Sequence, residues 1–292
     1  MTDLNSLIAD EAGKFVRQSP LNRLAAFDGD PIFGAPLVGF AAGDDPLFTD
    51  YKRIIGRLHM TPREAMERYN KLSGVSACPA AVSVIVWVLP FDNEVRRSVR
   101  AKTVVTSKRY NHARHKGDKV IAGLSAYLAG ALRSHGHRAF SPELSPLFRQ
   151  YQRWGNARTN WSLRHAAYAA GLGTFSLNDA LITPLGISHR LGSLLVDTGL
   201  TPSLKPYKDP FENCLYYREG TCGLCVKRCP AGAISERGHD REKCGSYFRY
   251  EAPGILGEQG RLKEYIGRSV GCGLCQTGVP CEAGIPKSLK KK

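Results

Sequence analysis

The cysteines of this chain constrain its fold more than any other feature. Eight of the nine lie between Cys214 and Cys281. One block reads Cys-Gly-Leu-Cys-Val-Lys-Arg-Cys-Pro over residues 222–230, and a second begins Cys-Gly-Leu-Cys at residue 272. The first block matches the last three cysteines and the proline of the bacterial ferredoxin run, Cys-x2-Cys-x2-Cys-x3-Cys-Pro. The first position of that run is Glu219 here, so we expect Cys214 to supply the missing thiolate.

Eight thiolates make two complete sets of four, which is what two 4Fe–4S clusters require. In ferredoxins the cysteine before the proline ligates the other cluster, and this crossing divides the eight into two sets. The first set is Cys214, Cys222, Cys225 and Cys281, and the second is Cys229, Cys244, Cys272 and Cys275. Zinc sites and structural disulfides are the alternatives, because paired Cys-x2-Cys motifs also bind zinc. The phrase Cys-Pro-Ala-Gly-Ala-Ile favours iron–sulfur clusters. The ninth cysteine, Cys78, is expected to be a small buried hydrophobe.

The rest of the chain is long enough to bury a substantial core. Its 292 residues are 42% hydrophobic and 23% charged, which is ordinary for a soluble globular protein. The N-terminal residues do not have the basic-then-apolar pattern of a signal peptide. The longest apolar run, near residues 82–89, is too short to cross a bilayer. With reduced thiolates, this predicts a cytoplasmic protein with no membrane partner. The formal charge of +15 stays strongly positive after about −2 for each cluster, so either an anionic partner or plain solubility explains it.

Apolar periodicity and capping signals predict an α/β body before the cysteines. We expect a helix from Thr61 to about residue 72, since Thr61 and Glu64 form a capping-box pattern around Pro62. We expect a central buried strand at 82–89 because the run is β-branched and apolar on both faces. The remaining expectations are helices at 4–16, 118–135 and 161–171, strands at 138–140 and 191–196, a loop at 28–46, an α/β domain over 1–205 and a cluster domain over 206–292.

The segment that leads into the cysteines carries a second pattern. Ala-Gly-Leu-Gly at 170–173 is followed by Asn178, by Leu-Ile-Thr at 181–183 and by Val-Asp-Thr at 196–198. Followed by two ferredoxin-type motifs with Cys244 between them, this order resembles the epoxyqueuosine reductases and the related reductive dehalogenases. The resemblance covers roughly residues 82–281. It implies a nitroreductase-like α/β body with a C-terminal ferredoxin-like double-cluster module.

The resemblance also implies a base-off cobalamin between the body and the module, near one cluster. The positions that would lie against the corrin are Gly171, Leu172, Gly173, Thr174 and Asn178. A glycine turn does allow close backbone approach to a flat ligand. The same glycines could simply end a helix.

This chain departs from the family pattern in three places. Arg-Tyr-Asn-His at 109–112 stands where the family has Asp-Tyr-His, and Ser-Pro-Glu-Leu-Ser-Pro at 141–146 stands where it has an Asp-Ser-x-Pro phrase. The family's C-terminal helical repeats have no counterpart, so we expect a short, divergent member without tight nucleic-acid binding. The candidate proton donors are Tyr110, His112 and Glu143, each of which could instead be structural.

Four arginines, with no acid among them, precede Asn178 and could bind a phosphate or carboxylate or could lie on a solvated face. They are Arg149, Arg153, Arg158 and Arg164. Our leading hypothesis is a cytoplasmic reductase that takes electrons from a low-potential donor such as a ferredoxin or flavodoxin. Two 4Fe–4S clusters and a corrinoid would pass them to a small anionic or nucleotide-like substrate. An electron-transfer protein without cobalamin is the alternative, and an iron–sulfur nucleic-acid binder ranks third because no RNA-binding motif is present.

Overall fold

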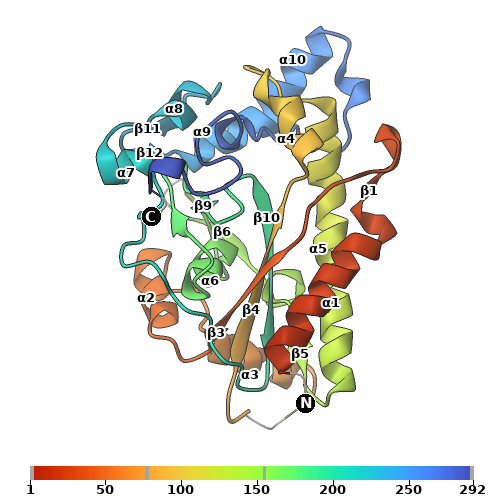
Figure 1. The fold of residues 1–292 in the computed structure, drawn as a ribbon, viewed down its shortest axis with the longest axis vertical. Coiled ribbons are helices and arrows are strands. Elements are labelled where there is room, and N and C mark those ends of the chain that lie inside the picture. Colours follow the sequence, from red (N-terminus) through yellow and green to blue (C-terminus); the bar gives the residue numbers. More distant parts are fainter. Residues whose placement is uncertain (1–2, 76–78, 154–155, 290–292) are drawn as a thin grey trace.

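The computed structural model describes residues 3–75, 79–153 and 156–289, so Cys78 lies outside the described residues. A four-stranded antiparallel sheet, in the order β3-β4-β10-β5, forms its centre (Figure 1). The strands are β3 (Leu37–Ala42), β4 (Ser83–Pro90), β5 (Ala139–Phe140) and β10 (His189–Val196). The mixed α/β class predicted from the sequence is confirmed.

Strand β4 is buried along its whole length between β3 and β10, as expected for residues 82–89. Its side chains alternate between two cores, with Val86 on one face and Trp87 on the other. Gly192 of β10 lies opposite Trp87, and a Cβ at Gly192 would come within 2.7 Å of the indole nitrogen. The sheet therefore has two apolar faces, and both require a covering layer.

Helices cover both faces of the sheet. On one face lie α1 (Leu4–Gln18), α4 (Asn93–Arg100) and α5 (Lys108–Ser134). On the other lie α2 (Leu47–Ile54), α3 (Pro62–Leu72) and α6 (Leu163–Ala169). Helix α3 begins with the predicted capping box, in which Thr61 and Glu64 exchange hydrogen bonds. No helix in the described part of the chain is long and apolar enough to cross a membrane.

Two predicted boundaries are wrong. Helix α5 begins at Lys108, ten residues before the expected start, with Ser107 accepting a hydrogen bond from the Tyr110 amide. Its first turns are rich in basic residues, which are good helix formers on an exposed face. The expected loop at 28–46 contains β3, which Pro36 and Gly43 flank and which has Gly39 in its interior.

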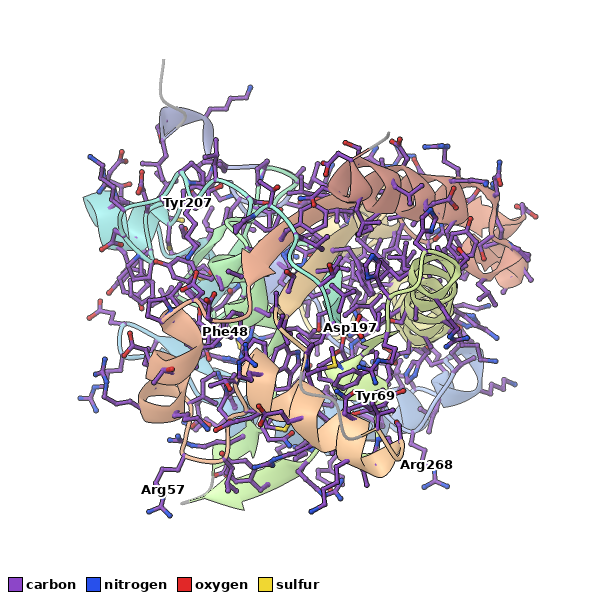
Figure 2. The ribbon with its side chains drawn as sticks, turned by 90° about the horizontal axis from the view of Figure 1, so that it is seen from below. Phe48, Arg57, Tyr69, Asp197, Tyr207 and Arg268 are labelled. Atoms are coloured by element: carbon purple, nitrogen blue, oxygen red, sulfur yellow. The ribbon has the colours of Figure 1, made fainter. Side chains whose placement is uncertain are left out.

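Short hairpins connect the main elements. Strand β1 (Arg23–Leu24) pairs with β2 (Asp30–Pro31), β6 (Gln150–Arg153) with β7 (Asn156–Thr159), and β8 (Thr174–Phe175) with β9 (Leu181–Ile182). The edge strand β5 is held by Asp197, whose carboxylate accepts from the amide and the Nε of Arg138 at 2.8 and 2.9 Å. Figure 2 labels Asp197 together with Arg57 and Arg268, whose side chains extend outward from the molecule.

The cysteine segment caps one end of the sheet (Figure 1, top). It contains α7 (Leu215–Glu219), α8 (Leu224–Lys227), β11 (Ile234–Ser235), β12 (Gly238–His239), α9 (Arg241–Ser246) and α10 (Ala252–Glu258). Leu177, Ile182 and Ile187 of the body pack into the same small core as Cys214. The domain boundary near residue 205 stays a prediction, since apolar contacts cross it.

Candidate functional site

The eight described cysteines are free thiols and gather in two groups. Cys214, Cys222, Cys225 and Cys281 line one small space and influence one another electrostatically. Cys272 and Cys275 are influenced in the same way by Cys229 and Cys244. These groups have the membership that the ferredoxin pattern predicts for two clusters. Their role as ligands stays a prediction.

Burial and mutual repulsion hold several of these thiols in the protonated form. Burial, followed by the charges of neighbouring cysteines, raises the pKa of Cys281 to about 12 and that of Cys225 to about 11. Burial likewise raises the pKa of Cys272 to about 12. Cysteine binds metal as the thiolate, so binding of the predicted clusters would release these protons.

A single metal ion and a cubane make different demands on the four sulfurs of each group. Among the described residues, no three His, Cys, Asp or Glu side chains are placed to hold a single metal ion. One zinc ion needs every sulfur about 2.3 Å from one centre, whereas a cubane spreads four thiolates over four irons. Gly273 has φ +65°, and a side chain there would overlap the ring of Tyr110. Gly223 has an extended φ of −171° that any residue could adopt.

A cavity of about 880 Å³ lies between the body and the cysteine segment. Helices α2 and α6 and the strand β7 contribute to it from the body, and β12 and α9 from the cysteine segment. One side is an aromatic wall, formed by Tyr51, His165, Tyr168, Phe175 and Phe211. The ring centroids of His165 lie 4.8 Å from those of both Tyr51 and Phe175. The volume is within the range of small-molecule and cofactor sites, about 300–1,000 Å³.

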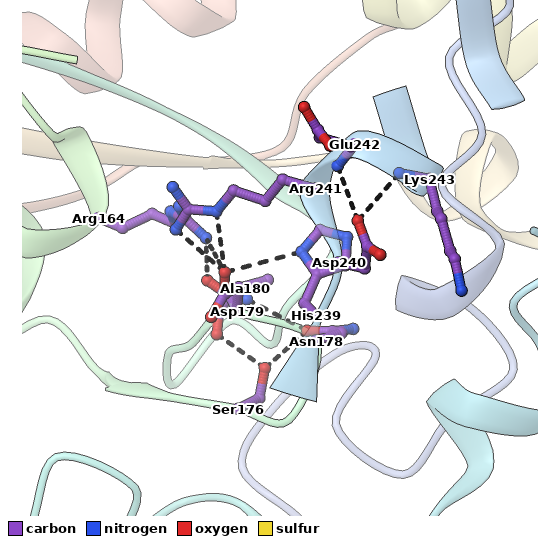
Figure 3. A network of polar contacts seen from close by, with 10 residues as sticks. All are labelled: Arg164, Ser176, Asn178, Asp179, Ala180, His239, Asp240, Arg241, Glu242 and Lys243. Carbon is purple, nitrogen blue, oxygen red and sulfur yellow. Dashed lines mark hydrogen bonds and ion pairs between the residues drawn. The ribbon is translucent and has the colours of Figure 1, made fainter. Parts of the chain in front are cut away.

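The lining of the cavity also carries charge. Asp179, on the turn between β8 and β9, accepts hydrogen bonds from Nε and Nη2 of Arg241 at 3.1 and 3.0 Å. Nη1 of Arg164 lies 3.9 Å from the same carboxylate oxygen and donates to the Asp179 carbonyl (Figure 3). We call Asp179, Arg164 and Arg241 the arginine end of the cavity. Burial would raise the pKa of Asp179, but its contacts with His239, Arg164 and Arg241 hold that pKa well below its usual range.

His239 connects the arginine end to the second group of cysteines. Its Nδ1 lies 3.7 Å from Oδ2 of Asp179, too far for a hydrogen bond but within reach of an ion pair. Burial would lower the pKa of His239, but Asp179 and the neighbouring Cys244 raise it to about 9. One wall of the cavity is therefore the loop between Cys229 and Cys244.

The five positions assigned to the corrin lie outside the lining of this cavity. Side chains at Gly171 and Gly173 would overlap the carbonyls of Leu204 and Ile182, so the glycines serve close backbone packing. Thr174 is fully buried, and its hydroxyl accepts from the Asn213 amide. Leu172 belongs to the core of the body. Gly171 has the predicted left-handed conformation, with φ +70°.

Asn178 is the one of the five that approaches the cysteines. Its side-chain amide donates to the Cys275 carbonyl at 2.9 Å, and its oxygen accepts from Ser176 and from the Ala180 amide (Figure 3). It also lines the small space shared by the first cysteine group. Contact of these five residues with a corrin stays a prediction.

The three candidate proton donors also lie away from the cavity lining. Tyr110 is buried against Gly273, and burial raises its pKa to about 12. A ring nitrogen of His112 lies 3.2 Å from the Glu264 carbonyl, tying α5 to the cysteine segment. The Glu143 carboxylate accepts from the amide and hydroxyl of Ser193 on β10, at 2.8 and 3.0 Å. Their catalytic roles stay predictions.

Only some of the four predicted arginines line the cavity. Arg158 and Arg164 line the cavity, whereas Arg149 is exposed and donates to nearby carbonyls; the side chain of Arg153 lies outside the described residues. Sequence reasoning missed Asp179 and the aromatic wall. The signal for Asp179 was an Asn-Asp pair in a turn position, where a positive φ (66° here) is tolerated.

Comparison with known proteins gives the chain its relatives. No protein-family model matches it. Epoxyqueuosine reductase of Staphylococcus aureus (strain NCTC 8325 / PS 47) is 36% identical over 126 residues, which is 42% of this chain and 30% of that protein. Over this segment the chain is similar to epoxyqueuosine reductases. The enzyme of the same name from Bacillus anthracis is 32% identical over 125 residues, 42% of this chain and 30% of that protein.

One solved structure has a similar fold. A reductive dehalogenase, whose structure suggests a mechanism for B12-dependent dehalogenation, aligns with 87% of this chain and 30% of its own, with a TM-score of 0.51 and 15% identity. At that identity the alignment concerns the fold alone. The matches thus cover less than a third of the length of these relatives.

Proposed function

We propose that this chain is an iron–sulfur reductase in which two 4Fe–4S clusters deliver electrons to the 880 Å³ cavity. The observation that carries the proposal is the arrangement of two four-thiol groups beside that cavity, with His239 adjacent to both Cys244 and the cavity. Relationship to a family of reductases supports the same chemistry. A simple electron carrier has no need of a body with a lined cavity.

The cavity supports a corrinoid as the immediate electron donor to the substrate. Its volume and the flat rings of Tyr168, Phe175 and Phe211 suit a large planar cofactor. When bound, a corrinoid supplies a strongly reducing metal centre. The aromatic wall would exclude water from the reacting face, and the arginine end would orient the anionic part of the ligand.

The electron balance requires an external partner. Reduction of a substrate by two electrons consumes two one-electron transfers from a low-potential donor, of the ferredoxin or flavodoxin class, together with protons to balance charge. The first cysteine group flanks the exposed Leu224 in sequence and would receive these electrons. Reduced thiolates and this donor class support a cytoplasmic location.

The test is retention of cobalamin by anaerobically reconstituted protein. After desalting, the protein should keep cobalamin and give a base-off cobalt(II) signal in electron paramagnetic resonance. Tyr168→Ala removes part of the aromatic wall and should weaken retention by about tenfold, since one aromatic contact contributes on the order of 1–2 kcal/mol. Tyr250→Ala, at a residue that is 71% exposed, is the matched control and should retain cobalamin as the wild type does.

An electron-transfer protein or reductase subunit without cobalamin is the second candidate, favoured by the placement of Gly171 and Gly173 against backbone. Protein that carries about eight irons but loses all cobalamin on desalting would make this the better account. We expect nucleic acid to bind weakly and to be released as salt rises. Tight binding of tRNA at physiological salt would contradict that expectation.

A further inference from the structure

A separate cavity, of about 250 Å³, shares no lining residue with the 880 Å³ cavity, and we call it the α10 cavity. One side of it is the segment 101–106, which connects α4 to α5. The other side is formed by residues in and after α10, namely Ile255, Gln259, Arg261 and Tyr265. The body therefore meets the cysteine segment at this cavity (Figure 1). Its volume lies below the usual range for drug-sized ligands, about 300–1,000 Å³, and suits a small ligand.

Among the described residues that line the α10 cavity, the charged ones are both cations, Lys102 and Arg261. Lys102 forms no ion pair within the described part of the chain. Nε of Arg261 lies 3.4 Å from Oε1 of Glu264, and Nη1 donates to Oε1 of Gln259 at 3.4 Å. Its Nη2 has no acceptor among the same residues. Both cations are exposed, and exposed charges alone hold an anion weakly, so a site here needs deeper donors.

Thr106 is the deeper donor in this lining. It is 2% exposed, and its hydroxyl has no hydrogen-bond partner within the described residues. A buried polar group without a partner is destabilising, and such groups are rare in folded proteins. An acceptor bound in the α10 cavity would give this hydroxyl the partner that the protein itself does not provide.

The backbone beside Thr106 is held in place through its carbonyls. The Val104 carbonyl accepts from the hydroxyl of Tyr247 at 2.7 Å, and the Thr106 carbonyl accepts from the hydroxyl of Tyr265 at 2.9 Å. A carbonyl and the next N–H point in opposite directions across a trans peptide, so the Val105 amide points away from Tyr247. That amide has no acceptor within the described residues. The segment is thus fixed by the cysteine segment while an amide donor remains unused.

The same segment leads into the N-terminus of α5. Ser107 caps this 27-residue helix by accepting from the Tyr110 amide at 3.0 Å. The aligned peptide dipoles give this end of the helix a partial positive charge, and helix N-termini are common neighbours of bound anions. The helix end therefore adds to the positive potential of Lys102 and Arg261.

We propose that the α10 cavity binds a small tetrahedral oxyanion, phosphate or sulfate, through Lys102, Arg261 and the Thr106 hydroxyl. These donors come from two sides of the cavity, so the ligand must accept hydrogen bonds in several directions, as a tetrahedral oxyanion does. The inference goes beyond the proposed function and requires neither clusters nor a corrinoid. A bound oxyanion would contact both sides of the cavity and so join the body to the cysteine segment.

The experiment is isothermal titration calorimetry of anaerobically reconstituted protein with inorganic phosphate, at an ionic strength held constant with chloride. Wild type should show saturable binding at one site per chain. Thr106→Val should weaken phosphate by about three- to tenfold, and Arg261→Gln by about tenfold, as expected for loss of a neutral and of a charge-assisted hydrogen bond. Lys263→Gln, at an exposed cation outside the lining, is the matched control and should bind phosphate as wild type does.

Thermal unfolding gives Thr106→Val a test of opposite sign. Without phosphate this variant should unfold at the same temperature as wild type or higher, because it no longer buries an unpaired hydroxyl. With phosphate, wild type should gain more in Tm than Thr106→Val or Arg261→Gln, since a ligand stabilises only the folded form that binds it. Phosphate also stabilises proteins through exclusion from their surface, but that effect does not saturate and is shared by all variants. Phosphate binding that does not saturate, or an equal gain in Tm in all variants, would overturn the proposal.

Two competition arms identify the source of the oxyanion. Sulfate should displace phosphate, because it has the same shape and also carries negative charge. Glycerol 3-phosphate that binds more tightly than phosphate, and less tightly to Thr106→Val, assigns the site to the phosphate group of a larger molecule. Glycerol 3-phosphate that does not compete assigns it to the free anion. Chloride that displaces phosphate as well as sulfate does would overturn the assignment to an oxyanion.

Discussion

At the scale of single residues, the structure gives several polar side chains positional roles. Glu143 is an example, because its carboxylate accepts two hydrogen bonds from Ser193, whose hydroxyl also accepts from Trp161 at 3.0 Å. The chain of contacts joins the segment after β5 to the middle of β10. A carboxylate held in this way fixes the backbone and has no access to the cavity lining.

We expect Glu143→Gln to keep the fold and to become relatively more stable as pH rises. Burial raises the pKa of Glu143, although its hydrogen bonds act in the opposite direction. Because its pKa is higher in the folded than in the unfolded protein, Glu143 stabilises the fold fully at pH values below the unfolded-state pKa, about 4.3. This stabilisation is lost as pH rises through the folded-state pKa. Glutamine does not titrate, so the stability of Glu143→Gln should not fall with pH for this reason. Thermal unfolding of both proteins at pH 5 to 8 measures it, and a stability difference that stays constant or reverses with pH would contradict the assignment.

At the scale of elements, close backbone approach matters more than side-chain chemistry in the turn after α6. Gly171 packs against the 204–205 loop, and Gly173 packs against β9. The glycine pattern that resembles a cofactor-binding turn has a sufficient structural cause in these contacts. If Gly173 serves packing, its substitution should lower the stability of the ligand-free protein. If it serves only ligand contact, that stability should not change.

Gly173→Ala should destabilise the protein by about 1–3 kcal/mol, because its Cβ would overlap the Ile182 carbonyl. Urea unfolding of cobalamin-free protein measures this. Gly130→Ala is the matched control, since a Cβ at that exposed position of α5 meets nothing within 4 Å. The control should be neutral or stabilising by up to about 1 kcal/mol. Unchanged stability in Gly173→Ala would leave ligand contact as the explanation.

Arg228 joins two elements that are far apart in sequence. It donates to the Leu274 carbonyl at 2.9 Å and to the carbonyls of Val99, Arg100 and Lys102 at 3.2–3.4 Å. Those last three carbonyls are at the C-terminal end of α4, where a cation also complements the helix dipole. Arg228 therefore ties the cysteine segment to the body.

Arg228→Met should lower the free energy of unfolding by about 1–3 kcal/mol, because it removes charge-assisted hydrogen bonds to several carbonyls. Lys227→Met, at the exposed neighbouring residue, is the control and should change stability by less than about 0.5 kcal/mol. Limited proteolysis adds a spatial measurement, since cleavage near residues 101–106 should accelerate in Arg228→Met and not in Lys227→Met. Equal proteolysis rates in the two variants would argue against this tie.

Much of this element-level structure could be predicted from sequence. The capping box of α3 and the apolar run of β4 are local signals, and the structure realises both. The cavity was not predictable, because Tyr51, Phe175 and Arg241 meet only through tertiary packing. Strand β3 was missed because its glycine and short length weaken the local β signal. Its strand conformation depends on pairing with β4, which is a tertiary contact.

At the scale of the whole molecule, eight cysteines that span 68 residues converge at one end of the sheet as two neighbouring groups. Cys275 of the second group is also influenced by Cys225 of the first, so the groups lie side by side. Their membership followed from the ferredoxin pattern, whereas their position beside a cavity did not.

Reconstituted wild type should contain about eight irons and eight sulfides, and Cys214→Ser should contain about four of each. Cys244→Ser should lose the other four, because it belongs to the other group. Iron and sulfide analysis, with electron paramagnetic resonance of the reduced proteins, measures both. Full iron with an unchanged spectrum in Cys214→Ser would show that the first ligand comes from elsewhere.

His239 and Arg241 belong to the loop whose two ends are Cys229 and Cys244. The order in which the protein matures follows from this connection. Under the proposed function, iron–sulfur clusters hold both ends of that segment in place, so we expect a freshly synthesised chain without clusters to bind its ligand weakly. Cluster assembly would then have to precede ligand binding. A chain without clusters, which cannot transfer electrons, would therefore not bind substrate.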